Sequence, residues 1–248
     1  MEFCVAKINE FTAKYEIAGL KVLMTTYFDR TRELARDYLA KTEWDEPDHE
    51  IIFDRNYYEE NKNDFPPGAS SEDMEYIFTG EYFHRLILDH NGLMLHSSAV
   101  VVDGYAYLFS ADSGIGKSTH TNLWLEKFGD KAFIINDDKP AIRKIDGEWY
   151  VYGTPWCGKH NTNKNAKAKL GAIMFLERSE NNWIETENIN DAIPKVFKQT
   201  TRKLYLEEYM DKLLSNIEEL LKETPLYKMG CDISEDAVDM AYENIRRV

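Results

Sequence analysis

The stretch "YAYLFSADSGIGKSTHTNLWLEKF", residues 105–128, constrains the fold more than any other part of this sequence. A run rich in aromatic and apolar residues leads into a glycine-rich turn, and the turn leads into a helical pattern that Gly129 closes. A strand, a tight turn and a helix start in this order place backbone N–H groups and the positive end of the helix dipole around one point. The stretch therefore predicts an anion site within a mixed α/β fold.

The turn matches the phosphate-loop pattern G-x-x-x-x-G-K-[ST] at three of its four fixed positions, which are Gly116, Lys117 and Ser118. Ala111 stands where the pattern has its first glycine. Alanine is acceptable there if its φ angle is negative, because only a positive φ requires glycine. The alternative is a chance glycine turn beside a surface lysine, and the flanking strand and helix favour a nucleotide loop.

The predicted cradle for ATP comprises Ser113, Gly114, Ile115, Gly116, Lys117, Ser118 and Thr119. In this interpretation the glycines let the backbone approach the phosphates closely. Lys117 holds the β- and γ-phosphates, and the Ser118 hydroxyl is a ligand of Mg²⁺.

Two adjacent carboxylates, Asp137 and Asp138, follow the short apolar run "KAFIIN". In phosphate-loop folds an aspartate at such a strand end typically handles the metal. Two acids can divide the tasks, one accepting the proton of an attacking hydroxyl and the other contacting Mg²⁺. Both can serve only if the chain leaves the strand here, which Pro140 favours. The alternative is an ordinary polar turn.

Two further positions are candidates for the site. His96 lies at the start of the predicted hairpin and precedes the glycine loop, and the alternative to a site residue is a structural histidine. Lys159 follows "GTPWCG" and is a candidate catalytic cation for the charge that develops on a transferred phosphoryl group. It belongs to a cluster of lysines for which a solvated basic surface is the alternative; its other members are Lys164, Lys167 and Lys169.

The rest of the chain predicts a mixed α/β (α+β) protein with an N-terminal segment, residues 1–88, beside a core, residues 89–248. Strands are expected at 3–11, 21–28, 93–110 (a hairpin turning at Asp103-Gly104), 131–136, 141–153 (a second hairpin), 169–178 and 225–232. Helices are expected at 29–40, 71–90, 117–128, about 191–222 and 234–247.

Composition narrows the classes of partner. The formal net charge is −14 over 248 residues, so neither nucleic acid nor an anionic membrane is expected as a general partner. No apolar run reaches the length of a membrane span, and the N-terminus lacks the apolar core of a signal peptide. The three cysteines show no metal-ligand spacing. A cytoplasmic protein is expected.

These motifs resemble a known family. "HSSAVVVDGYAYLFSADSGIGKST" resembles the core of bacterial HPr kinase/phosphorylase, which has a histidine, a hairpin, a loop close to "GDSGIGKS", a helix, and a strand ending in a double aspartate. "GKSTHTNLW", "NDDKP", "GTPWCGK" and "AIMFLER" are also similar to HPr-kinase-like proteins of bacterial peptide-modification clusters, some of which phosphorylate a serine of lasso-peptide precursors. The resemblance covers about residues 90–180, and weakly the stretch "PLYKMGCDISEDAV".

The resemblance implies a β-rich core like the nucleotide-binding core of phosphoenolpyruvate carboxykinase, with the loop at one end and helices at its flanks. It also implies that Asp137 is the general base, that Asp138 contacts the metal and that His96 lies at the active site. A homo-oligomer would agree with it.

The chain departs from the family at Ala111, in lacking the later "E-[IL]-R-G" signature with its metal-binding glutamate, and in lacking room for the full N-terminal domain of the regulatory enzyme. Phosphorylation of HPr itself and the reverse phosphorolysis are therefore not implied.

The hypothesis that follows is an ATP- and Mg²⁺-dependent kinase that phosphorylates a hydroxyl, with a serine of a peptide or protein as its acceptor. One alternative is a nucleotide-binding accessory module, which would have no need of a base such as Asp137. The other is a kinase of small-molecule hydroxyls, which a closed pocket would favour over an open groove.

Overall fold

The computed structural model describes residues 10–53, 60, 63, 66–200 and 207–246. It divides into two compact units, residues 1–83 and 84–248. Both units combine strands with helices, so the protein has a mixed α/β fold, as the sequence predicts. Within the described residues, no helix combines the length and the apolar character needed to cross a membrane.

The N-terminal unit has a three-stranded sheet in the order β1-β2-β3, in which β1 and β2 are antiparallel and β3 runs parallel to β2. Its elements are β1 (Phe11–Ile17), β2 (Leu20–Thr26), α1 (Asp29–Ala35), η1 (Arg36–Tyr38), β3 (His49–Ile52) and most of α3 (Ser71–Leu88). Alternate residues of β1 and β2, such as Tyr15 and Val22, are buried on one face of this sheet. The predicted strand at 3–11 lies almost entirely outside the described residues.

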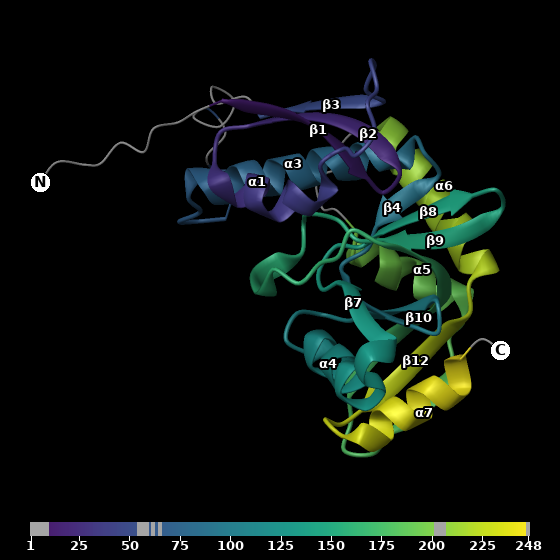
Figure 1. The fold of residues 1–248 in the computed structure, drawn as a ribbon. Helices are drawn as coiled ribbons and strands as arrows, with labels where there is room; N and C mark the ends of the chain where they lie inside the picture. Colours follow the sequence, from purple (N-terminus) through teal and green to yellow (C-terminus); the bar gives the residue numbers. More distant parts are fainter. Residues whose placement is uncertain (1–9, 54–59, 61–62, 64–65, 201–206, 247–248) are drawn as a thin grey trace, which may run out of the picture. The chain divides into compact units, whose positions relative to one another are not determined.

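The C-terminal unit is built on a larger sheet, which has nine strands in the described part of the chain (Figure 1). Seven of them follow the order β4-β8-β9-β10-β6-β5-β7, and β12 joins on β10 with β11 beside it. The strands are β4 (Gly92–Met94), β5 (Ser97–Val102), β6 (Tyr105–Ser110), β7 (Ala132–Asn136), β8 (Ala141–Ile145), β9 (Glu148–Tyr152), β10 (Lys167–Arg178), β11 (Trp183–Thr186) and β12 (Leu226–Cys231).

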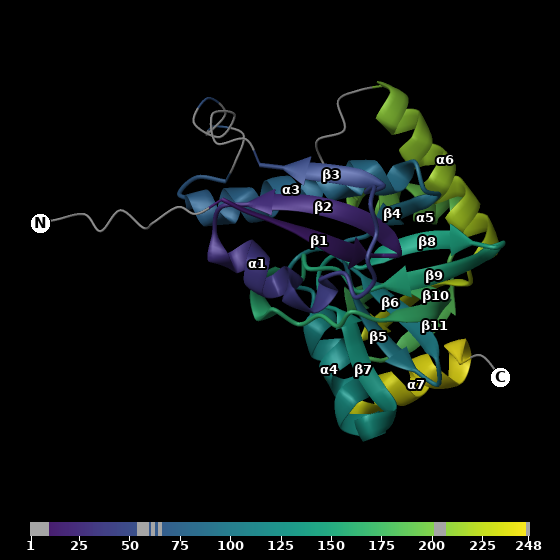
Figure 2. The ribbon, with the colours of Figure 1, turned by 45° about the horizontal axis from the view of Figure 1, so that its top comes forward.

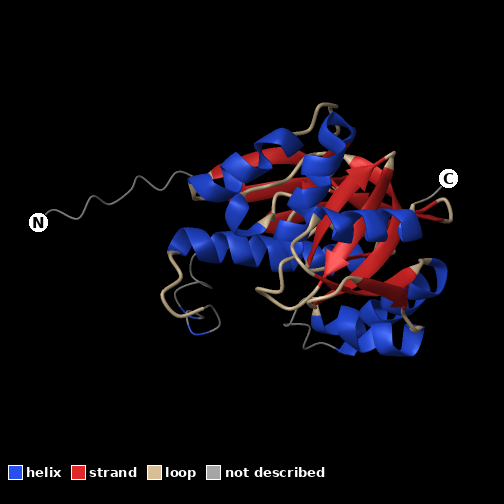
Figure 3. Cartoon of the chain, turned by 90° about the horizontal axis from the view of Figure 1, so that it is seen from below, coloured by secondary structure: helices blue, strands red, loops and turns tan. Residues whose placement is uncertain are grey.

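Helices cover both faces of the larger sheet (Figures 1, 2 and 3). One apolar cluster joins the sheet to α5 (Ile189–Lys198) and α6 (Glu207–Glu223), and it includes Val196 and Ile217. A second cluster joins the other face to α4 (Lys117–Phe128) and α7 (Glu235–Ile245), and it includes Trp124 and Ala241. The sheet is therefore the middle of three layers, and the strand ends are where it meets solvent.

Most predicted elements are confirmed, including both hairpins, the helix 117–128, the last strand and the last helix. The continuous helix expected over 191–222 is wrong, because α5 ends at Lys198 and α6 begins at Glu207. Strand β11 was not predicted. Its four residues "WIET" are half-buried or exposed, and only their pairing with β12 makes them a strand. The short 3₁₀ segments η3 (Gly129–Lys131) and η4 (Gly158–His160) complete the C-terminal unit.

Candidate functional site

The glycine-rich loop connects the end of β6 directly to the start of α4. Gly114 has a φ of 83° and Gly116 a φ of 120°, conformations that side chains other than glycine adopt with strain. Ala111 is not among the residues with positive φ, so an alanine is acceptable at the position where the pattern has its first glycine. The residues from Asp112 to Gly114 are exposed. The backbone thus turns at the two glycines and presents the N-terminus of a twelve-residue helix.

Lys117 folds back over this loop. Its Nζ donates a hydrogen bond to the carbonyl oxygen of Ala111 at 2.9 Å, and the residue is 8% exposed. Burial lowers the pKa of the lysine, while the neighbouring carboxylates of Asp138, Asp137 and Asp112 oppose this shift. A half-desolvated ammonium at the first turn of a helix is a strong partner for an anion. Of the other predicted cradle residues, Ser118 is half-buried and Thr119 is exposed on the same turn.

Asn136 determines how the chain leaves β7. Its side-chain oxygen accepts hydrogen bonds from the backbone N–H groups of Asp138 (2.9 Å) and Lys139 (2.7 Å). Its amide nitrogen donates to the carbonyl oxygen of Thr154 at 3.0 Å. These bonds end the strand and turn the backbone, so the two aspartates no longer alternate across a sheet. The condition under which both can serve one site is met.

Asp137 lies on the side of α4. The Ser98 hydroxyl donates to its Oδ1 at 2.5 Å, and the same hydroxyl contacts Thr121 Oγ1 on α4 at 2.7 Å. Thr121 is also close to the carbonyl oxygen of Lys117, at 3.2 Å. Asp137 is therefore connected through two hydroxyls to the first turns of the helix that follows the loop.

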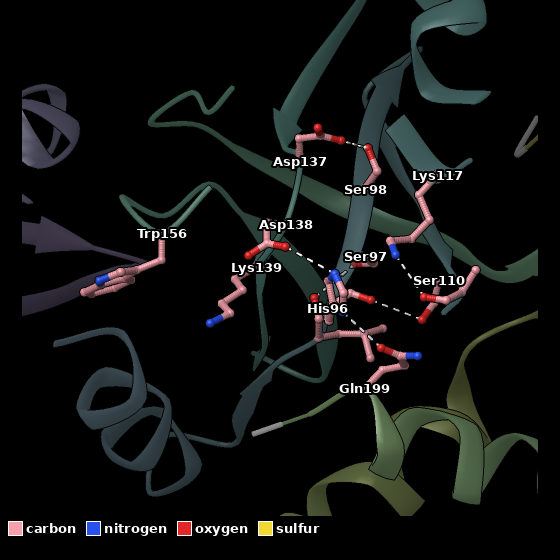
Figure 4. A network of polar contacts seen from close by, with 12 residues as sticks. His96, Ser97, Ser98, Ser110, Lys117, Asp137, Asp138, Lys139, Trp156 and Gln199 are labelled. Carbon is pink, nitrogen blue, oxygen red and sulfur yellow. Dashed lines mark hydrogen bonds and ion pairs between the residues drawn. The ribbon is translucent and has the colours of Figure 1, made fainter. Parts of the chain in front are cut away.

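Asp138 lies on the side of His96 (Figure 4). Its Oδ1 is 3.2 Å from His96 Nε2, and its side chain is 26% exposed. Burial raises the pKa of this carboxyl, but the hydrogen bond from His96 and the charges of Lys139, His96 and Lys117 together bring it below its ordinary value. Asp138 is thus an acid in contact with a second proton-carrying group, as a proton-transfer site requires.

The loop is braced by side chains from β10 and from the end of α5. Arg178 Nη2 donates to the carbonyl oxygen of Gly114 at 2.5 Å, and Lys198 and Gln199 both bond to the Asp112 carboxylate. Asp112, Lys198 and Gln199 line a pocket of about 170 Å³. Gln199 has no local sequence signal, since it lies at the end of an amphipathic helix about 90 residues beyond the loop.

The lysine cluster after "GTPWCG" stays outside this network. Lys164 Nζ lies 4.1 Å from the ring centroid of Phe133, Lys167 Nζ lies 3.8 Å from that of Tyr150, and Lys169 pairs with Glu148. These three lysines therefore fit the solvated basic surface that the sequence analysis gave as the alternative to a catalytic cluster. Lys159 is exposed and has no ion pair or hydrogen bond with another described residue.

The backbone before Lys159 does reach the site. Gly158 has a φ of 75°, and a Cβ there would lie 2.9 Å from Cβ of Asp138. Glycine is therefore required at this position both by its φ and by the close approach of Asp138. The loop that contains "GTPWCG" packs against the aspartates through its backbone, and the catalytic role of the Lys159 side chain stays a prediction.

A magnesium ion would meet hard oxygen donors here, namely the carboxylates of Asp137 and Asp138 and the hydroxyl of Ser118. No group of three His, Cys, Asp or Glu side chains that could enclose a metal occurs among the described residues. Mg²⁺ in nucleotide sites commonly uses one or two carboxylates together with substrate phosphates and water. The residues present fit that sparser kind of site.

Comparisons with known proteins add little to the geometry. No protein-family model matches the chain, and no curated protein does. Among solved structures, the Hpr(Ser) kinase/phosphatase from Coxiella burnetii matches with a TM-score of 0.37 and 11% sequence identity, over 61% of this chain and 95% of that chain. At this similarity neither site residues nor an activity can be transferred. The similarity to proteins of peptide-modification clusters stays a prediction.

Proposed function

We propose that this protein is an ATP- and Mg²⁺-dependent kinase that transfers the γ-phosphoryl group to a hydroxyl, with a serine of a peptide or protein as the acceptor. One observation carries the proposal: Asp137 is joined through the hydroxyls of Ser98 and Thr121 to the first turn of α4, which directly follows the glycine loop, and the adjacent Asp138 contacts His96. A nucleotide-binding module needs the loop and its lysine. It does not need a carboxylate and a histidine in contact beside them.

The loop and Lys117 would bind the phosphates of ATP. The backbone N–H groups around Gly114 and Gly116 and the N-terminus of α4 supply fixed dipoles for these oxygens. The Lys117 ammonium would leave the Ala111 carbonyl for a phosphate oxygen, a stronger acceptor because it is charged. When bound, Mg²⁺ would neutralise developing charge on the phosphates, with Ser118 and one of the two aspartates as its protein ligands.

The contacts favour Asp138 as the general base and Asp137 as the residue toward the metal. Asp137 is connected to α4, the helix that carries Ser118, whereas Asp138 faces His96 and is more exposed. This assignment is the reverse of the one that the family resemblance implies. The two assignments differ in which aspartate takes the proton of the acceptor and which one holds the metal.

In the proposed reaction, the acceptor oxygen forms a bond to the γ-phosphorus. The bond from this phosphorus to the β,γ-bridging oxygen breaks, and its electron pair leaves with ADP. The proton of the acceptor hydroxyl passes to Asp138. It would then leave Asp138 through the contact with His96. Fixed charges in a partly dry site would stabilise the transition state.

A thermal-shift experiment tests the nucleotide site first. Mg²⁺-ATP at a hundred times its Kd stabilises a native state by about 2.7 kcal/mol, which should raise Tm by several degrees. Lys117→Ala should abolish most of this shift, and Lys167→Met, on the solvated face, should preserve it. An unchanged shift in Lys117→Ala would place the nucleotide elsewhere and overturn the proposal.

Transfer itself is tested with γ-labelled ATP and a library of serine-containing peptides, with the matching alanine peptides as controls. Label on serine peptides alone supports the peptide kinase. Label on small alcohols alone would support the small-molecule alternative. A nucleotide shift without label transfer or phosphate release would favour the accessory module.

A further inference from the structure

Gln199, the residue that follows α5, makes polar contacts both with His96 and with Asp112 of the glycine loop. Its backbone oxygen accepts from the His96 N–H at 2.8 Å, and its side-chain Oε1 lies 3.1 Å from His96 Nδ1. Its side-chain Nε2 donates to Asp112 Oδ1 at 3.0 Å. One side chain therefore joins Asp112, at the entrance of the glycine loop, to the histidine beside Asp138. Figure 4 shows the contact between Gln199 and His96.

Asp112 determines which way this amide faces. Lys198 pairs with the Asp112 carboxyl and lowers its pKa, so the group is ionised near neutral pH and can only accept hydrogen bonds. The NH₂ end of the Gln199 amide must therefore face Asp112, which leaves the oxygen facing His96. The orientation of an amide is assigned from its partners, and here a charged acceptor decides it.

The amide in turn requires a hydrogen on Nδ1 of His96. Because Oε1 can only accept, Nδ1 must carry the hydrogen that lies between them. Nε2 is then the nitrogen presented to Asp138, at 3.2 Å. The backbone bond from His96 N–H to the Gln199 carbonyl holds the same residue in place from the other side. Histidines that act on protons commonly depend on such a bond at the second nitrogen.

We infer that Gln199 is a positioning residue, whose amide holds Asp112, orients the ring of His96 and keeps a hydrogen on its Nδ1, so that Nε2 faces Asp138. The inference rests on the proposed function, for which it supplies the residue that prepares the proton path. A purely structural role as the C-cap residue of α5 would require only its backbone, because Gln199 N–H already bonds to carbonyl oxygens within that helix.

Two substitutions separate these roles. Gln199→Met keeps the length of the side chain and removes both of its polar ends. Gln199→Glu keeps an acceptor for His96 Nδ1 and replaces the donor to Asp112 with a charge that repels it. If the bond to His96 is what matters, Gln199→Glu should recover most of what Gln199→Met loses. Lys198→Met is the matched control, since it removes the neighbouring contact with Asp112 and leaves Gln199 itself intact.

The first readout is phosphate release from Mg²⁺-ATP, with water as the acceptor. For Gln199→Met we expect kcat to fall at least about tenfold, while KM and the nucleotide-induced thermal shift change by less than about threefold. Gln199→Glu should regain a kcat within about threefold of wild type. Equal kcat in Gln199→Met, Lys198→Met and wild type would overturn the inference, as would a loss in Gln199→Met confined to Tm.

The second readout is the ¹⁵N NMR spectrum of His96, assigned by comparison with His96→Gln. Wild type should show hydrogen on Nδ1, and Gln199→Met should shift the ring toward hydrogen on Nε2, the form that free imidazole side chains prefer. A wild-type spectrum with hydrogen on Nε2 alone would overturn the inference even in an active enzyme. Because the spectrum does not depend on turnover, an inactive wild type with the Nδ1 tautomer would overturn the proposed function and leave the role of Gln199 supported.

Discussion

Each of the two units holds a carboxylate withdrawn from water, and the two have opposite surroundings. In the N-terminal unit, Glu75 of α3 is 0% exposed and accepts backbone N–H bonds from Tyr27 (2.5 Å) and Phe28 (3.3 Å). In the C-terminal unit, Asp138 keeps 26% of its side chain exposed and contacts the titratable His96. The more deeply buried carboxylate is the structural one. What a buried acid contacts is therefore a better guide to its function than how deeply it is buried.

Glu75 acts as a cap for α1 supplied by another helix. Phe28 occupies the N-cap position of α1 and has no side-chain oxygen to offer the free N–H groups there. The Glu75 carboxylate accepts from this end of the helix, where the dipole also favours a negative charge. The two N–H groups that it accepts from belong to the backbone and cannot exchange a proton with it, which fits a structural role.

The largest expected effect is on turnover at Asp138. Asp138→Asn keeps the size of the side chain and removes its ability to take a proton, so we expect kcat to fall by about a hundredfold to ten-thousandfold. The nucleotide-induced thermal shift should survive. Asp137→Asn should instead weaken the Mg²⁺-dependent part of that shift. Loss of turnover in Asp137→Asn with the Mg²⁺ effect lost in Asp138→Asn would restore the assignment implied by the family resemblance.

The next effect is on stability at Glu75. Glu75→Gln leaves one acceptor oxygen where two were used and turns an NH₂ group toward backbone donors. We expect the free energy of unfolding to fall by about 1–3 kcal/mol, the usual cost of an unsatisfied buried group, in a urea titration. The Mg²⁺-ATP thermal shift should be unchanged. Loss of the nucleotide shift in Glu75→Gln would remove the distinction between the two carboxylates.

The contributions of Glu75 and Asp138 to folding stability should also change in opposite directions as the pH falls. Burial raises the pKa of Glu75, so the folded protein takes up this proton more readily than the unfolded chain. Wild type should therefore gain stability relative to Glu75→Gln as the pH falls toward 4.5. The pKa of Asp138 is lowered, so wild type should lose stability relative to Asp138→Asn as the pH falls below 3.8. If both stability differences changed in the same direction with pH, the proposed distinction between Glu75 and Asp138 would be wrong.

A smaller effect is expected where the loop is braced. Arg178 donates to the carbonyl oxygens of Gly114 and Ile115 and so orients the loop. It does not occupy the backbone N–H groups that are predicted to bind the phosphates. Arg178→Met should weaken Mg²⁺-ATP binding by about three- to tenfold, in keeping with the loss of one or two partly exposed hydrogen bonds, and should leave kcat at saturation nearly unchanged. Calorimetric titration measures the first, and a collapse of kcat would give Arg178 a catalytic role.

The smallest effect is expected at Lys159. Its side chain is exposed, and only the backbone of its neighbour Gly158 packs against Asp138. We expect Lys159→Met to change kcat by less than about threefold on a peptide acceptor, because an exposed charge is well screened. A loss above tenfold would confirm the predicted role of Lys159 as a catalytic cation, one that reaches the phosphoryl group only in the complex.

The sequence alone determined the parts of this protein that depend on neighbours along the chain. Alternating apolar residues, the two Asp-Gly turns and Gly129 predicted both hairpins and α4 at nearly their observed bounds. The glycine pattern placed the loop, and the double aspartate after a short apolar run placed the turn at the end of β7. All of these are local, because strand period, helix period and positive φ angles act over a few residues.

The tertiary structure decided which side chains these local elements meet. His96 and Gln199 are 103 residues apart, Ser98 and Asp137 are 39 apart, and neither pair has a pattern that links its members in the sequence. The same holds for Glu75, whose partners lie 47 and 48 residues earlier in the chain. The sequence could name the carboxylates. It could not say which one caps a helix and which one faces a histidine, because that depends on how the strands and helices pack once the chain has closed.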